Sequence, residues 1–200
     1  MMQKIVLTGG PQAGKTTILR ALSMEYSDKI VFVPEIASLL LSNGFPEPGK
    51  DIIWNETWQA IFQNAILSLQ INMEEAYVLL AKQKNILLII CDRGVLDGAA
   101  YTPGGVKEFC DLYGLHSQNE LEKYNAIIHL ESMATTRPSF YGKDGNDVRF
   151  EDVERAQDLE YRTRAVWENH PQYHFIAGCD NIVEKIDQVL TLVERILAEN

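Results

Sequence analysis

The segment GGPQAGKTT, from Gly9 to Thr17, constrains the fold of this chain more than any other stretch. It contains the complete pattern G-x-x-x-x-G-K-[ST], in which a glycine-rich turn leads directly into a helix. We expect Gly9, Gly10 and Gly14 to turn the backbone through positive φ angles, so that the amides converge on an anionic ligand. The helix dipole adds to this attraction. The pattern therefore predicts a site for the phosphates of a nucleotide.

The residues on either side of the turn support this prediction. Gln3–Thr8 is a short apolar run, and Ile18, Leu19 and Leu22 share one face of a predicted helix. A strand, a glycine turn and a helix in this order are the context that a phosphate-binding loop requires. We expect Lys15 to reach the β- and γ-phosphates, and the Thr16 hydroxyl to bind Mg²⁺. The predicted nucleotide-binding residues are Gly9, Gly10, Pro11, Gln12, Ala13, Gly14, Lys15, Thr16 and Thr17.

Length and composition indicate one α/β domain that spans residues 1–200. The net charge of −10 argues against a nucleic-acid surface, which needs clustered Lys and Arg. The sequence contains no run of eighteen apolar residues, so we expect no transmembrane helix. The strand expected close to the first residue leaves no room for a signal peptide. Cys91, Cys110 and Cys179 are too widely spaced for a C-x-x-C pair. We therefore expect reduced, buried thiols in a cytoplasmic protein without a zinc site.

Strand and helix signals alternate along the chain, which predicts a parallel sheet with right-handed crossovers. Strands are expected at 4–7, 30–33, 86–91, 126–130 and 174–177, and helices at 15–26, 34–42, 55–82, 106–113, 119–124, 151–168 and 182–198. The long helix carries an apolar stripe that we assign to the core. The stripe consists of Trp58, Ile61, Phe62, Ala65, Ile66, Leu69, Met73 and Ala76.

Asp92 and Arg93 follow the predicted buried strand 86–91. Ligands of parallel sheets bind at the carboxyl ends of the strands, so both side chains fall where a nucleotide would lie. Asp92 fits the acidic residue that binds Mg²⁺ directly or through water. Motor and remodelling ATPases usually have a glutamate after this aspartate, whereas an arginine cannot be a general base but can clamp phosphate oxygens. The pair therefore favours a phosphotransferase, with a structural ion pair as the alternative.

Glu35 follows the predicted strand 30–33, where an acceptor hydroxyl would approach the γ-phosphate. A carboxylate at that place can take the proton of the hydroxyl as a general base. The alternative is a purely local role, because Glu35 follows Pro34 at the start of a predicted helix, where the dipole favours an acidic residue.

The segment 134–151 has the composition of a mobile lid, with glycines, a proline and an Asp-Gly pair. Arg137, Lys143 and Arg149 are candidates for neutralising the transferring phosphoryl group when the lid closes, and Arg149 is the strongest of them. The alternative is an exposed loop with solvated charges. On the next helix, Arg155 and Arg162 are seven residues apart and share a face that we expect to point into the cleft.

The motifs together resemble a known family. The segments GGPQAGKTT, VPEIA at 33–37, CDRGVLD at 91–97 and DGNDVRFED at 144–152 are similar to small phosphate-loop proteins often labelled AAA-type ATPase domains. Among these, the chain resembles the ribosylnicotinamide kinase domain of a bacterial NAD regulator. The resemblance covers nearly the whole chain. It implies a three-layer αβα sandwich with a five-stranded parallel sheet in the order 2-3-1-4-5, and a site for nucleotide-dependent phosphoryl transfer.

The chain also resembles deoxynucleoside kinases, in which an Asp-Arg pair ends the third strand and a helical Phe-Gln pair holds the acceptor base. Phe62-Gln63 matches that pair, although a helical glutamine can equally be polar surface. In those kinases a Glu-Pro pair ends the second strand, whereas the order here is Pro34-Glu35. Asp97 either holds the acceptor or caps a turn.

We therefore expect a kinase that transfers the γ-phosphate of ATP to a hydroxyl of a small, nucleoside-like acceptor. The [NT]-K-x-D signature of Ras-like GTPases is absent, which argues against that class of protein. GTP is still a possible ligand. The expected catalytic residues are Lys15, Glu35, Arg93 and Arg149, and the expected Mg²⁺ residues are Thr16 and Asp92. The alternative is a regulatory NTP-binding or NTP-hydrolysing switch without a small-molecule acceptor. The sequence leaves the acceptor and the oligomeric state open.

Overall fold

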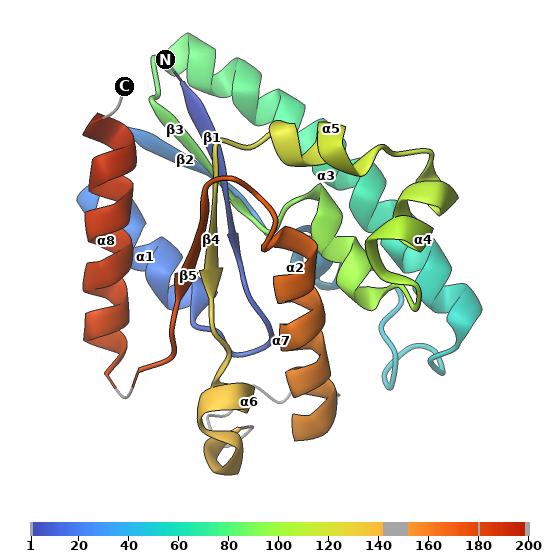
Figure 1. The fold of residues 1–200 in the computed structure, drawn as a ribbon. Coiled ribbons are helices and arrows are strands. Elements are labelled where there is room, and N and C mark those ends of the chain that lie inside the picture. Colours follow the sequence, from blue (N-terminus) through green and yellow to red (C-terminus); the bar gives the residue numbers. More distant parts are fainter. Residues whose placement is uncertain (1, 142–151, 180, 199–200) are drawn as a thin grey trace.

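A sheet of five parallel strands forms the centre of the molecule, in the order β2-β3-β1-β4-β5 (Figure 1). The computed structural model describes residues 2–141, 152–179 and 181–198. The observed strand order confirms the predicted order 2-3-1-4-5. The strands are β1 (Gln3–Thr8), β2 (Ile30–Val33), β3 (Leu88–Asp92), β4 (Ala126–Leu130) and β5 (Tyr173–Ile176).

Helices cover both faces of this sheet, which gives the three predicted layers (Figure 1). Helices α1 and α8 pack on one face, and α3, α4 and α7 pack on the other. None of the helices in the described ranges is long and apolar enough to cross a membrane. The helices are α1 (Lys15–Glu25), α2 (Ile36–Ser42), α3 (Glu56–Lys84), α4 (Gly105–Tyr113), α5 (Ser117–Glu122), α6 (Met133–Thr136), α7 (Val153–Trp167) and α8 (Ile182–Ala198), with 3₁₀ turns η1 (Val95–Tyr101) and η2 (Pro138–Phe140).

The central strand β1 divides its side chains between two hydrophobic clusters. Ile5 and Leu7 join the cluster beneath α1 and α8, while Val6 joins the cluster beneath α3, α4 and α7. All three side chains are fully buried. Successive side chains of a strand point to opposite faces, so a strand covered on both sides must be apolar throughout. This explains why three apolar residues follow one another in the middle of β1.

Two predicted boundaries shift at the end of the sheet where the candidate residues gather. The third strand ends at Asp92 rather than before it, so this carboxylate belongs to the strand itself. Helix α2 begins at Ile36, two residues later than predicted, because Glu35 has the extended backbone of an N-cap residue, with φ −62° and ψ 113°. Pro34 and Glu35 therefore form the connection between β2 and α2.

The predicted core stripe of α3 is wrong in part. Ile61 is 58% exposed, and Ala76 is also exposed, whereas Trp58 and Phe62 are buried as expected. The buried face of α3 carries polar residues that hydropathy alone assigns to the surface. These are Gln63, Gln70 and Glu74. Glu74 accepts hydrogen bonds from Lys4, Gln70 and Tyr124, which offset the cost of burying it.

The three cysteines are free thiols. Cys91 and Cys110 are buried as predicted, but Cys179 is only half-buried, because it lies in the connection between β5 and α8.

Candidate functional site

The loop between β1 and α1 passes through left-handed backbone at three positions. These are Gly9 with φ 140°, Gln12 with φ 55° and Gly14 with φ 90°. A Cβ atom on Gly9 would lie 2.1 Å from the Leu130 carbonyl oxygen, so a larger residue does not fit there. The predicted turn is present, with Gln12 rather than Gly10 at positive φ. Gly14 is the N-cap of α1, which starts at Lys15.

Backbone carbonyls of this loop are bound from the outside by the segment after β4. The Ser132 hydroxyl donates to the Pro11 carbonyl, and the Met133 amide donates to the Gln12 carbonyl at 3.4 Å. The N–H of a trans peptide unit points away from its C=O. The Gln12 amide, paired with the Pro11 carbonyl, is therefore directed to the opposite side of the loop.

Lys185 of α8 binds the next carbonyl group of the same loop. Its Nζ donates to the Ala13 carbonyl at 2.9 Å and to the Glu131 carbonyl at 2.7 Å, and the residue is 5% exposed. Burial lowers the pKa of Lys185. The Gly14 amide, which belongs to the same peptide unit as the Ala13 carbonyl, points away from Lys185. The amides of 12–14 thus share one side, which suits an anionic ligand.

Lys15 lies buried at the start of α1, with 8% of its surface exposed. Its Nζ makes a long contact of 3.5 Å to the Gly9 carbonyl oxygen. Burial lowers the pKa of Lys15, and the positive charge of Arg93 lowers it further, while Glu35 and Asp92 act in the opposite direction. The negative charge of a bound phosphate would stabilise the charged form of this ammonium group.

Asp92 ends β3 with a carboxylate that is 8% exposed. Burial and the charge of Glu35 raise the pKa of Asp92 to about 6, although Lys15 and Arg93 act to lower it. Among the described residues, none hydrogen-bonds its Oδ1 atom. A buried carboxylate oxygen without a donor fits a cation or a water molecule of its hydration shell. Thr16, the other predicted Mg²⁺ residue, lies exposed in the first turn of α1.

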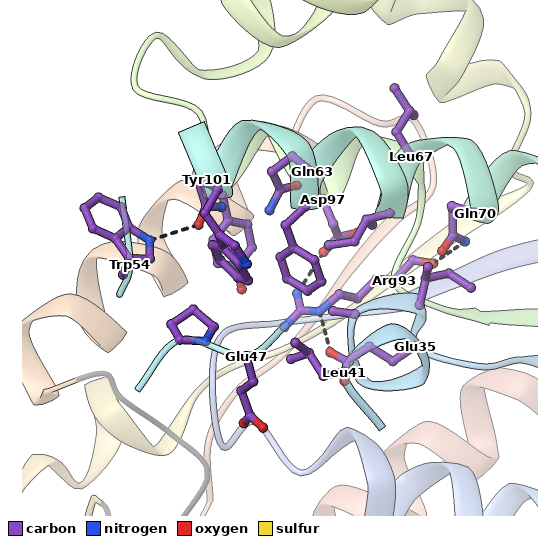
Figure 2. A pocket seen from close by; sticks show the side chains of 18 of the residues that line it. Glu35, Leu41, Glu47, Trp54, Gln63, Leu67, Gln70, Arg93, Asp97 and Tyr101 are labelled. Atoms are coloured by element: carbon purple, nitrogen blue, oxygen red, sulfur yellow. Dashed lines mark hydrogen bonds and ion pairs between the residues drawn. The ribbon is translucent and has the colours of Figure 1, made fainter. Parts of the chain in front are cut away.

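Arg93 lies between two carboxylates, as Figure 2 shows. Its Nε donates to Glu35 Oε1 at 2.8 Å, and its Nη1 donates to Asp97 Oδ1 at 3.1 Å. The backbone of Arg93 has φ 72°, which is uncommon for a residue other than glycine. Its amide donates to the Leu7 carbonyl at 3.0 Å, and its carbonyl accepts from Gln70 at 3.1 Å. Contacts on both sides therefore hold this strained conformation.

Glu35 directs its carboxylate to side chains rather than to the start of α2. It makes no side-chain capping hydrogen bond, and it accepts from Arg93 and from the Ser38 hydroxyl at 2.5 Å. Burial acts to raise its pKa, but the charges of Arg93 and Lys15, together with these hydrogen bonds, lower the pKa of Glu35 to about 2. The carboxylate is therefore ionised at neutral pH.

Asp97 caps the turn η1 and also lines the cavity beside Arg93. Its Oδ2 accepts from the Gly94 amide at 2.8 Å and from Trp167 Nε1 at 3.2 Å. Its Oδ1 accepts from the Thr8 hydroxyl as well as from Arg93. The turn-capping role left open by the sequence is thus present, and a contact with an acceptor stays a prediction.

A cavity of about 1020 Å³ opens beside these charged groups (Figure 2). It is lined by α2, the loop 47–54, α3 and η1. Trp58 and Phe62 form an aromatic wall, with ring centroids 4.8 Å apart in a stacked arrangement. Phe45 packs on Phe62 at 5.1 Å. Gln63 also lines the cavity and is only 7% exposed, so it is not polar surface.

The basic residues predicted in segment 134–151 and on the following helix differ in where they lie. Lys143 and Arg149 lie outside the described residues, so their roles stay predictions. Arg155 lines the cavity and pairs with Asp158 at 2.7 Å. Arg162 does not line it, because its guanidinium donates to the carbonyls of 102 and 103, and that part of the prediction is wrong.

Sequence reasoning missed the residues that hold the phosphate loop from behind. Ser132, Glu160 and Lys185 each hydrogen-bond the loop, yet they lie between 121 and 172 residues away from their partners in the chain. No local pattern marks them. The one available signal was their type, because a Glu and a Lys in apolar helix faces are costly to bury unless they have partners.

Comparisons with known proteins agree with this architecture. The family described as AAA domain matches residues 4–180. The fold is similar to a solved structure of deoxyadenosine kinase from M. mycoides with bound dATP, with a TM-score of 0.61, 16% identity, and 96% of this chain and 99% of that chain covered. A second structure of that kinase, with products dCMP and a flexible dCDP bound, gives a TM-score of 0.53 and 18% identity over the same shares. No curated protein matches the sequence significantly. At these identities the two structures show a common fold.

Proposed function

The chain belongs to the AAA domain family, and from that premise we propose that it is a Mg²⁺-dependent kinase that phosphorylates a nucleoside-like metabolite. The observation that carries this proposal is the juxtaposition of two sites. The phosphate loop and its Lys15 lie next to a large cavity whose inner end carries Glu35, Arg93 and Asp97. A motor ATPase needs no such cavity for a second substrate. ATP is the proposed donor, with GTP as a possible substitute.

The donor half of the site binds the nucleotide through the loop. The amides of 12–14 face the side on which phosphate oxygens would bind, and Lys15 would contact the β- and γ-phosphates. Thr16 and Asp92 would hold Mg²⁺, directly or through water, and the orphaned Oδ1 of Asp92 fits that role. When bound, Mg²⁺ would neutralise charge on the phosphates.

The acceptor half is the cavity. The buried Gln63 amide lines the cavity, so a ligand with donor and acceptor groups on one edge could form hydrogen bonds with it. The ring of Phe62 lies on the same wall and offers a surface for a flat heterocycle. The likeness to deoxyadenosine kinase supports the same substrate class. A nucleoside, including ribosylnicotinamide, is therefore the acceptor that we propose.

The chemistry would proceed at the end of the cavity next to Lys15. The acceptor hydroxyl oxygen attacks the γ-phosphorus, the bond to the bridging oxygen of ADP breaks, and the hydroxyl proton passes to Glu35. While Arg93 holds Glu35, the low pKa makes this carboxylate a weak base. A guanidinium group drawn towards the transferring phosphoryl group would raise that pKa and stabilise the developing charge. Arg149 is proposed to contribute a second positive charge.

The decisive experiment is a coupled assay of ADP release with ATP and Mg²⁺. It is run with and without a panel of nucleosides that includes ribosylnicotinamide. The proposal predicts a rise of at least tenfold with one acceptor, and its loss when Mg²⁺ is omitted. A slow rate that no acceptor changes, together with tight nucleotide binding, would refute a nucleoside kinase and favour a regulatory NTPase.

A further inference from the structure

A buried carboxylate from α7 lies directly behind the phosphate loop. Glu160 Oε2 accepts a hydrogen bond from the Gly10 amide at 2.8 Å and one from the Ser132 amide at 3.2 Å. Its Oε1 lies 2.7 Å from His129 Nε2. Glu160 is 2% exposed and His129 is fully buried. One carboxylate thus joins the phosphate loop, the end of β4 and α7.

The surroundings of Glu160 keep it ionised. Burial acts to raise its pKa, but the hydrogen bonds from His129, Gly10 and Ser132 outweigh burial and lower the pKa of Glu160. A buried charge is tolerated only where donors surround it, and three donors do so here. The carboxylate is therefore a strong acceptor for the Gly10 amide at neutral pH.

Glu160 lies so close to Gly10 that this position has no room for a larger side chain. A Cβ atom on Gly10 would lie 2.7 Å from Glu160 Oε2 and 3.0 Å from the Cβ of Glu160. The φ angle of Gly10 is not positive, so the close approach of Glu160 is what requires glycine at this position. Ser132, the second donor to Glu160, also holds the Pro11 carbonyl through its hydroxyl. Two successive residues of the loop are thus anchored at one point.

We propose that Glu160 is a positioning residue of the nucleotide site. By holding the Gly10 amide outward, it sets the orientation of the next peptide units and so keeps the amides of 12–14 on the ligand side. Glu160 touches no phosphate itself, and it acts through the backbone of the loop. The inference rests only on the nucleotide-binding half of the proposed function, and not on the identity of the acceptor.

The test is calorimetric titration of Mg-ADP into three variants and one control. Glu160→Ala removes the anchor and is expected to raise the Kd for ADP at least tenfold. Gly10→Ala displaces the carboxylate and is expected to act in the same direction. Glu160→Gln is expected to stay within threefold of the wild type, because its amide oxygen can still accept from Gly10 and Ser132. Glu120→Ala is the control, because Glu120 of α5 is also buried but pairs with Lys123, the C-cap residue of that helix.

Circular dichroism and the binding stoichiometry give the folded fraction of each variant. A purely structural carboxylate would lower the stability or the stoichiometry of Glu160→Ala and Gly10→Ala but leave the Kd of the folded fraction unchanged, and that result would overturn the inference. Equal loss of affinity in Glu160→Gln and Glu160→Ala would overturn it as well. If the wild type itself fails to bind Mg-ADP, the proposed function and the inference both fail. A wild type that binds Mg-ADP, together with an unchanged Kd in Glu160→Ala, refutes the inference alone.

Discussion

Arg93 Nε lies 2.8 Å from Glu35 Oε1, which joins the residue after β3 to the connection between β2 and α2. The two residues are 58 positions apart in the chain. They meet because β2 and β3 are neighbouring parallel strands, whose carboxyl ends lie at the same edge of the sheet. The proposed base and the proposed phosphate clamp are thus a single ion pair in the free protein.

Glu35→Ala tests the proposed base. We expect kcat to fall by about 10²–10⁴-fold, because the acceptor hydroxyl loses the group that takes its proton. The Kd for ATP is expected to change less than threefold, since the phosphate loop is intact. Both quantities follow from steady-state kinetics and a nucleotide titration.

Glu154→Ala provides the control for this change, because Glu154 is an exposed carboxylate in the first turn of α7. It should leave turnover as it is. Unchanged turnover in Glu35→Ala would rule out general-base catalysis by this residue and favour a structural ion pair with Arg93.

Arg93→Lys tests whether the planar guanidinium matters. A lysine keeps the charge, but it cannot direct two N–H groups at Glu35 and Asp97 in the geometry of Arg93. We expect kcat to fall by about 10²-fold or more, with a smaller effect on the KM for ATP. Steady-state kinetics with a saturating acceptor provide the measurement, and near-normal kcat would show that charge alone is sufficient.

Gln63→Leu tests how the acceptor is recognised. The substitution keeps the approximate volume of the side chain and removes its hydrogen-bonding groups. We expect the KM for the acceptor to rise by about tenfold, because the ligand edge loses its partner, while the KM for ATP stays constant. Gln83→Leu serves as the control, since Gln83 is an exposed glutamine of α3 that does not line the cavity. Parallel changes in both KM values would contradict a role confined to the acceptor.

Asp92→Asn tests the burial of an unpartnered carboxylate. The pKa of Asp92 is raised to about 6 in the folded protein, against an ordinary value of 3.8. The folded state therefore holds this proton more tightly than the unfolded state. Above pH 6 the folded chain carries the full cost of the buried charge, and this cost disappears as the pH falls from 6 to about 4.

We therefore expect Asp92→Asn, without nucleotide, to increase the free energy of unfolding by about 2 kcal/mol at pH 8. The gain should vanish near pH 4. Urea titrations at both pH values measure this difference, and Asp187→Asn, at an exposed position of α8, controls for a general loss of negative charge. Equal stability of the wild type and Asp92→Asn at pH 8 would show that the carboxylate carries no such cost. With nucleotide and Mg²⁺ present, the same variant should bind more weakly.

Much of the fold follows from local patterns in the sequence. The glycine turn between β1 and α1, the buried strand β3 and the helix α8 are all recognisable, because backbone conformation and hydrophobic period are properties of neighbouring residues. Once the strands are placed, their carboxyl ends also bring Glu35 and Asp92 to one edge of the sheet. The buried face of α3 was predicted wrongly in part, because its burial depends on residues far away in the chain. Gln70 and Glu74 are buried only because distant residues form hydrogen bonds with them.

By itself the sequence determined the phosphate loop, the alternation of strands and helices, and the type of residue at each strand end, because these depend on short segments and on the rules of parallel sheets. The strand order was implied by the resemblance to known phosphate-loop proteins. Only the tertiary structure decided which groups touch. It paired Arg93 with Glu35, turned Gln63 into the cavity, and placed Glu160 behind Gly10 from 150 residues away. Such contacts depend on how the helices pack against the sheet. Packing between residues far apart in the chain produces no periodic pattern in the sequence.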